Sequence, residues 1–133
     1  MAVPRENYCL ECFSLIPAEA AICPVCGARQ GDFSARDYRE KLIHALLHPL
    51  DDVRMRAIIA LGLRGEAETA DALVECALRH PADVVAGLEI VRGLARVKDA
   101  GARLDALAVL KERHPAHAVR EEAARLIQGE TNA

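Results

Sequence analysis

Four cysteines near the start of the chain have the type and spacing of a metal site. Cys9, Cys12, Cys23 and Cys26 follow the pattern C-x2-C-x10-C-x2-C. Two residues between paired cysteines allow a tight turn to direct both sulfurs to one point, and two such turns supply four thiolates in a tetrahedron. Zinc suits this ligand set because it accepts four sulfurs and has no redox chemistry. The spacing therefore predicts one structural Zn²⁺ ion bound by these four cysteines.

The two turns differ after their second cysteine. Gly27 follows Cys26 and can adopt a positive φ, whereas Phe13 follows Cys12 and predicts a weaker first turn. Because protein sulfurs would close all four positions, no substrate or activated water can bind the ion, and a structural role is expected. Iron in a rubredoxin-like site, two disulfides, and a redox switch that ejects zinc on oxidation are the alternatives.

Residues 8–27, YCLECFSLIPAEAAICPVCG, resemble a prokaryotic zinc ribbon over 20 of the 133 residues. The resemblance implies a small β-hairpin carrying two cysteine turns, or knuckles. With so few apolar side chains, this module is expected to fold only with its metal. The polar residues 28–36 read as a linker, and Ser34 with Asp37 resembles a capping box that opens a helix near residue 35.

Beyond the linker, the dipeptide His-Pro recurs at His48, His80 and His114, with separations of 32 and 34 residues. Apolar stretches of helical period flank each one, and proline ends one helix and suits the start of the next. The expected first helices are 36–47, 66–79 and 100–113, and the expected second helices are 51–64, 82–98 and 117–128.

Three such hairpins resemble a HEAT-like repeat array of the phycobilisome-lyase type, and the run from Asp52 to Gly62 carries the best match. The resemblance implies a mostly α fold in which a four-cysteine zinc ribbon precedes a short α-solenoid. The expected domains are a zinc ribbon with its linker at 1–33 and a repeat domain at 34–133. The repeats are expected at about 34–64, 65–98 and 99–130.

Composition agrees with a helical body and restricts the class of function. The chain has 133 residues, and all its aromatic residues, 3% of the total, lie among the first 38. The remaining core must use Ala, Leu, Val and Ile, of which Ala and Leu favour helices. A net charge of −3 gives no overall attraction to nucleic acid or anionic membranes. With no apolar run of about 18 residues and no signal-peptide core, we expect a cytoplasmic protein without a membrane span.

The remaining cysteine and histidines give no pattern of an enzyme. His44 and His48 lie four residues apart on one helix but have no evident third ligand, and Cys76 lies among apolar residues of a helix. No nucleophile elbow, P-loop or H-E-x-x-H motif is present, so a non-catalytic protein is expected.

Charge in the second helices indicates a binding surface. These helices carry eight basic and six acidic residues, and in HEAT-like arrays second helices line the concave surface. The interpretation is a scaffold or adaptor that binds a protein partner with an acidic segment. The candidate partner-binding residues are Arg54, Arg56, Arg92, Arg96, Arg120 and Arg125.

Other functions stay open at this point. They are a nucleic-acid-binding accessory protein, a phycobilin-lyase-like accessory subunit, and a redox or zinc sensor. The first and last hairpins of a short array each have one apolar face that no neighbouring repeat buries, so these faces must be covered. The zinc module would shield the first hairpin, or an end would pair with a second copy to form a homodimer.

Overall fold

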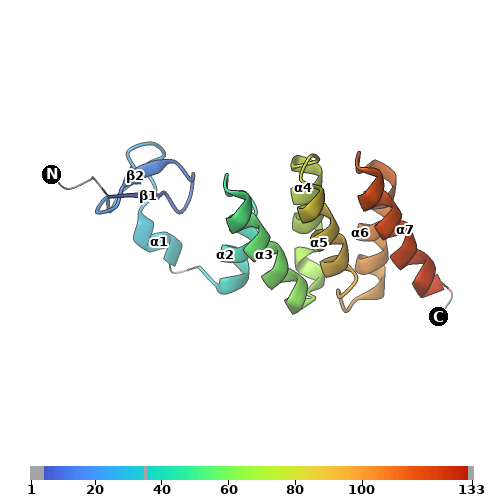
Figure 1. Ribbon diagram of the computed structural model, residues 1–133. Helices are drawn as coiled ribbons and strands as arrows, with labels where there is room; N and C mark the ends of the chain where they lie inside the picture. Colours follow the sequence, from blue (N-terminus) through green and yellow to red (C-terminus); the bar gives the residue numbers. More distant parts are fainter. Residues whose placement is uncertain (1–4, 35, 132–133) are drawn as a thin grey trace.

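The computed structural model describes residues 5–34 and 36–131, and this part of the chain is mostly helical. Two strands come first, β1 (Glu6–Tyr8) and β2 (Leu15–Pro17), followed by the short helix α1 (Gln30–Ser34). Six further α-helices and one 3-10 turn complete the described part: α2 (Tyr38–Ala45), α3 (Asp51–Arg64), η1 (Ala67–Thr69), α4 (Ala70–Arg79), α5 (Val84–Leu94), α6 (Ala100–Arg113) and α7 (His117–Thr131). Figure 1 shows the strands and α1 at one end of a row of helical hairpins that ends at α7.

The N-terminal part is a small antiparallel hairpin, in which Tyr8 of β1 lies opposite Leu15 of β2. Its interior is minimal because, among residues 5–33, only Cys9, Ile16 and Cys23 are buried, with Ala20 packed against them. A core of this size gives little hydrophobic stabilisation, so cysteine chemistry must contribute to the stability of this module.

The helical part stacks three hairpins, α2/α3, α4/α5 and α6/α7, around one continuous core. The second helices are neighbours along the row, α3 against α5 and α5 against α7, and α4 packs against α6. Buried Leu, Ile, Val and Ala side chains run without a break from Leu46 to Ala123. This arrangement confirms the predicted fold, a cysteine-bearing hairpin followed by a helical repeat solenoid. Within the described residues, no helix has both the length and the apolar character to cross a membrane.

The helix boundaries differ in detail from those expected. Asp37 itself caps α2, because its carboxylate accepts a hydrogen bond from the Glu40 N–H at 2.8 Å. Helix α1 was not predicted, and residue 35 lies outside the described residues. Helix α5 ends at Leu94 rather than at 98. Helix α3 ends at Arg64, as expected, and Gly65 caps it in a left-handed conformation with φ of 61°.

Two glycines allow α3 and α5 to pack with their backbones in contact. A Cβ atom on Gly62 would lie 3.0 Å from the Cα of Gly93, and a Cβ on Gly93 would lie 3.1 Å from the Cα of Gly62. Each of these glycines lies near the C-terminal end of its helix. Their contact sets the separation of the first two second helices.

Candidate metal centre

The four cysteines of the predicted zinc ribbon meet at one point. Their sulfurs all lie within 4.8 Å of one another. The Sγ atoms of Cys9 and Cys26 are 3.7 Å apart, and those of Cys12 and Cys23 are 3.8 Å apart. Each knuckle supplies one buried and one exposed cysteine. This arrangement of four sulfurs could hold one metal ion.

The two knuckles have the same local geometry. The N–H of Phe13 donates to the Cys9 carbonyl and the N–H of Gly27 donates to the Cys23 carbonyl, both at 3.0 Å. Phe13 has a φ of 63° and Gly27 a φ of 79°. The left-handed conformation costs an L-residue roughly 1–2 kcal/mol. Phe13 therefore adopts the conformation expected only of a glycine, and contacts elsewhere must offset its cost.

Hydrogen bonds favour the thiolate form at Cys9. Burial raises the pKa of this thiol, but N–H groups of Cys12 and Glu11 and the side-chain amide of Gln30 lower the pKa to about 6. At Cys26 a hydrogen bond from the Ala28 backbone lowers the pKa, yet desolvation and the three other cysteines raise it to about 12. Hydrogen bonds with Ser14 also lower the pKa of Cys12, so the cluster accepts its first negative charges readily and resists the charge on Cys26. A bound dication removes this resistance, so the donor set fits a thiolate-binding metal.

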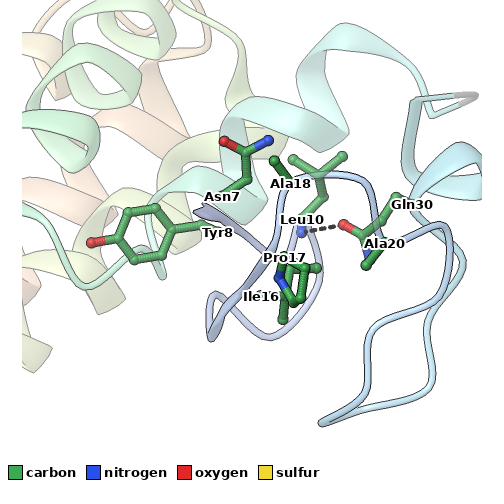
Figure 2. A pocket seen from close by; sticks show the side chains of 8 residues that line it. All are labelled: Asn7, Tyr8, Leu10, Ile16, Pro17, Ala18, Ala20 and Gln30. Carbon is green, nitrogen blue, oxygen red and sulfur yellow. Dashed lines mark hydrogen bonds between the residues drawn. The ribbon is translucent and has the colours of Figure 1, made fainter. Parts of the chain in front are cut away.

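Gln30, the first residue of α1, is a supporting residue that the cysteine pattern did not indicate. Its Nε2 donates to the Cys9 Sγ at 3.4 Å, and its Oε1 accepts from the Leu10 N–H at 2.9 Å. Figure 2 shows this second bond. Leu10 and Gln30 also line a groove of about 370 Å³. The lining residues are Asn7, Tyr8, Leu10, Ile16, Pro17, Ala18, Ala20 and Gln30. Gln30 therefore links α1 to the first knuckle.

The first knuckle also contacts the first helical hairpin. The ring of Phe13 lies 4.7 Å from the rings of both His44 and His48, and the ring of Tyr8 lies 4.6 Å from that of His48. The Nε2 of His44 donates to the Glu11 carbonyl at 2.8 Å. The two histidines thus serve as packing and hydrogen-bonding partners of the cysteine module.

A comparison with protein-family models relates the helical part to known proteins. The model for HEAT repeats matches residues 19–89, more than half of the chain. The chain belongs to the HEAT repeat family. No curated protein and no solved structure matches this chain.

In these HEAT repeats, two of the six arginines predicted to bind a partner have an internal role. Arg54 is only 8% exposed, and its guanidinium donates to the carbonyls of His48 and Pro49 at 2.8 and 3.0 Å. Arg120 donates in the same way to the carbonyls of His114 and Pro115, at 2.8 and 2.7 Å. Both cap the turn that joins two helices, because these carbonyls lie outside the preceding helix, α2 or α6.

The histidines of the same two turns complete this cap. Nδ1 of His48 accepts from the Leu50 N–H and Nδ1 of His114 from the Ala116 N–H, each at 3.0 Å. Burial lowers the pKa of both imidazoles, and the nearby Arg54 lowers that of His48 further. The pattern His-Pro-x4-Arg is thus a structural signature of the first and third turns.

The other four predicted arginines are exposed on the second helices. Arg56 lies on α3, Arg92 on α5 and Arg125 on α7, and Arg96 follows the end of α5. Arg125 is paired with Glu122 on its own helix, and Arg92 lies 4.0 Å from Glu89. Within the described residues, Arg56 and Arg96 have no carboxylate within ion-pair distance.

Cys76 lies apart from the cluster. It is buried in α4, its Sγ donates to the Leu46 carbonyl at 3.8 Å, and burial raises the pKa of its thiol. A raised pKa disfavours the reactive thiolate, so Cys76 behaves as a small core residue.

Proposed function

We propose that this chain is a non-catalytic scaffold that binds a protein partner on the concave surface lined by its second helices. One Zn²⁺ ion, held by Cys9, Cys12, Cys23 and Cys26, stabilises the N-terminal module. The observation that carries the proposal is a set of exposed apolar and cationic side chains on α3 and α5, here called the second-helix face. Its members are Arg56, Ile59, Leu63, Val85, Arg92 and Arg96.

The apolar members are unusually accessible. Ile59 is 41% exposed, Leu63 71% and Val85 70%. On α3, the helical repeat places Ile59 and Leu63 opposite the buried stripe that contains Ala57, Ile58 and Leu61. Exposed apolar side chains on two neighbouring helices are typical of a protein interaction surface.

Charge indicates the kind of partner. Arg56 and Arg96 have no ion-pair partner in the described part of the chain, and Arg92 has only a distant one. An acidic, amphipathic segment would place apolar side chains on Ile59, Leu63 and Val85 and carboxylates beside the arginines. By contrast, the groove of about 740 Å³ between α5 and α7 contains Arg92 and Arg125 with Glu121 and Glu122. Its charges balance, so the α3–α5 part is the better site for an acidic segment.

Quantitative affinity purification from the native cell tests the proposal. The bait proteins are the wild-type chain, Arg56→Glu, Leu63→Asp, and the control Arg113→Glu, which reverses an exposed charge on α6 in the other helix layer. A partner of this face should be depleted at least tenfold with Arg56→Glu and with Leu63→Asp, and retained with Arg113→Glu. Circular dichroism checks that all variants keep their helices. Identical co-purified proteins for all four baits would contradict the proposal.

A further inference from the structure

Contacts between the cysteine module and the repeat array converge on two side chains. The rings of Tyr8, Phe13 and Phe33 pack against His44 of α2 and His48 of the following turn, with centroid distances of 4.6 to 5.3 Å. The His44 ring also donates to the backbone carbonyl of Glu11. Tyr8, Glu11 and Phe13 lie in or beside the first knuckle, so this knuckle provides most of the joint.

Phe13 contributes most to this joint. It stands where the other knuckle has Gly27, and it adopts a positive φ that is unfavourable for an L-residue. The centre of its ring lies 4.7 Å from the ring centres of both His44 and His48. Aromatic pairs at this distance contribute about 0.5–1.5 kcal/mol beyond the area that they bury. Two such contacts offset the backbone cost, which explains why a phenylalanine is tolerated in this position.

The receiving helix needs such support. Helix α2 has eight residues, and none of them is fully buried. Isolated helices shorter than about 12 residues are marginal in water, so tertiary contacts must hold α2 in place. Leu46, the residue directly after α2, is buried in the core of the repeat array. The first knuckle packs on the histidines at the same end of α2.

We propose that the first knuckle is a metal-dependent cap of the repeat array. An ion bound by the four cysteines fixes Cys9 and Cys12 and thereby holds Tyr8, Glu11 and Phe13 on His44 and His48. Loss of the ion leaves the module with a core too small to keep this shape, so the aromatic contacts separate and α2 loosens. The inference rests on the metal site proposed above and adds that its occupancy controls the first repeat.

Hydrogen exchange of the full chain, read by mass spectrometry, tests this coupling. In the zinc-loaded wild type, amides of residues 38–50 should be protected, and chelation of the zinc should raise their exchange rates at least tenfold, while residues 84–113 change little. Phe13→Gly is the decisive variant. It keeps the positive φ and the four cysteines, so it should bind zinc as tightly as the wild type. With zinc bound, its residues 38–50 should nevertheless exchange clearly faster than in the zinc-loaded wild type, because the ring contacts with His44 and His48 are lost.

A matched control and the opposing outcomes complete the design. Tyr38→Ala removes an exposed aromatic ring from the other end of α2 and should keep zinc-dependent protection of the later residues 42–50. Zinc bound per chain is measured for every sample. A chain that binds no zinc refutes the metal site. If the chain binds zinc, two results would refute the coupling. One is equal protection of residues 38–50 with and without the ion, and the other is equal protection of these residues in zinc-loaded Phe13→Gly and wild type.

Discussion

At the residue scale, the cysteine spacing carried enough information to predict the cluster, and the surrounding residues did not. Two C-x2-C turns restrict their own geometry, so the meeting of Cys9, Cys12, Cys23 and Cys26 follows from local structure. The roles of Gln30 and Phe13 depend on where α1 and α2 lie, and no local pattern encodes that placement. Phe13 in particular suggested a weakened turn, whereas the structure gives it the glycine-like conformation and two ring contacts.

Metal content tests the cluster at this scale. The purified chain should contain one zinc ion, measured by elemental analysis. Cys23→Ser should lower the zinc content to below about a tenth of one ion, because it removes a buried ligand and the sulfur that accepts from the Val25 and Cys26 N–H groups. Cys76→Ser, in the core of α4, should keep one ion per chain. Equal zinc in both variants would mean that the cysteine cluster is not the site.

At the element scale, the His-Pro dipeptides predicted where the turns lie. They did not predict that Arg54 and Arg120 would donate hydrogen bonds to the carbonyls of these turns. Proline fixes where one helix ends and the next begins, which sequence shows directly. The arginine six residues after the histidine is read from sequence as surface charge, because its partners are backbone carbonyls that only the folded turn brings together. In the second repeat the corresponding residue is Ala86, and Asp83 instead caps α5 through the Ala86 N–H at 3.1 Å.

Replacement of Arg54 tests the arginine cap. Arg54→Met should lower the free energy of unfolding by about 2 kcal/mol, because two charged hydrogen bonds are lost and the carbonyls of His48 and Pro49 are left without these donors. The control is Arg56→Met on the same helix, where an exposed guanidinium is removed and the change should stay within about 0.5 kcal/mol. Urea denaturation of the zinc-loaded chains measures both. A similar loss for the two variants would show that the contribution of Arg54 is not specific to the turn.

At the scale of the whole molecule, repetition in the sequence was a good guide to the stack. Recurrent apolar positions required each hairpin to be covered by the next, and one core runs through all three hairpins. The distance between α3 and α5 depends on which residues of the two helices face each other, and the sequence of one helix does not give this. In the structure, Gly62 and Gly93 face each other, and their backbones are in contact.

Alanine substitution tests this packing. Gly62→Ala would place a methyl group 3.0 Å from the Gly93 backbone, so α3 and α5 must move apart. Overpacking costs about 1–3 kcal/mol, more than the roughly 1 kcal/mol that alanine contributes through helix propensity, so the melting temperature should fall. Gly101→Ala in α6 meets only an Asp99 oxygen at 3.6 Å and should leave the melting temperature unchanged or higher. If Gly62→Ala were as stable as Gly101→Ala, helix separation would not depend on the glycine pair.

The left-handed phenylalanine in the first knuckle also affects how related chains can be found. A search pattern that demands glycine after each cysteine pair passes over this chain at Phe13, although the backbone there matches that at Gly27. A pattern that admits an aromatic residue after one pair, followed by two histidines four residues apart some thirty positions later, would collect chains built with the same joint. Sequences with glycine in both places would lack the two ring contacts that Phe13 makes here.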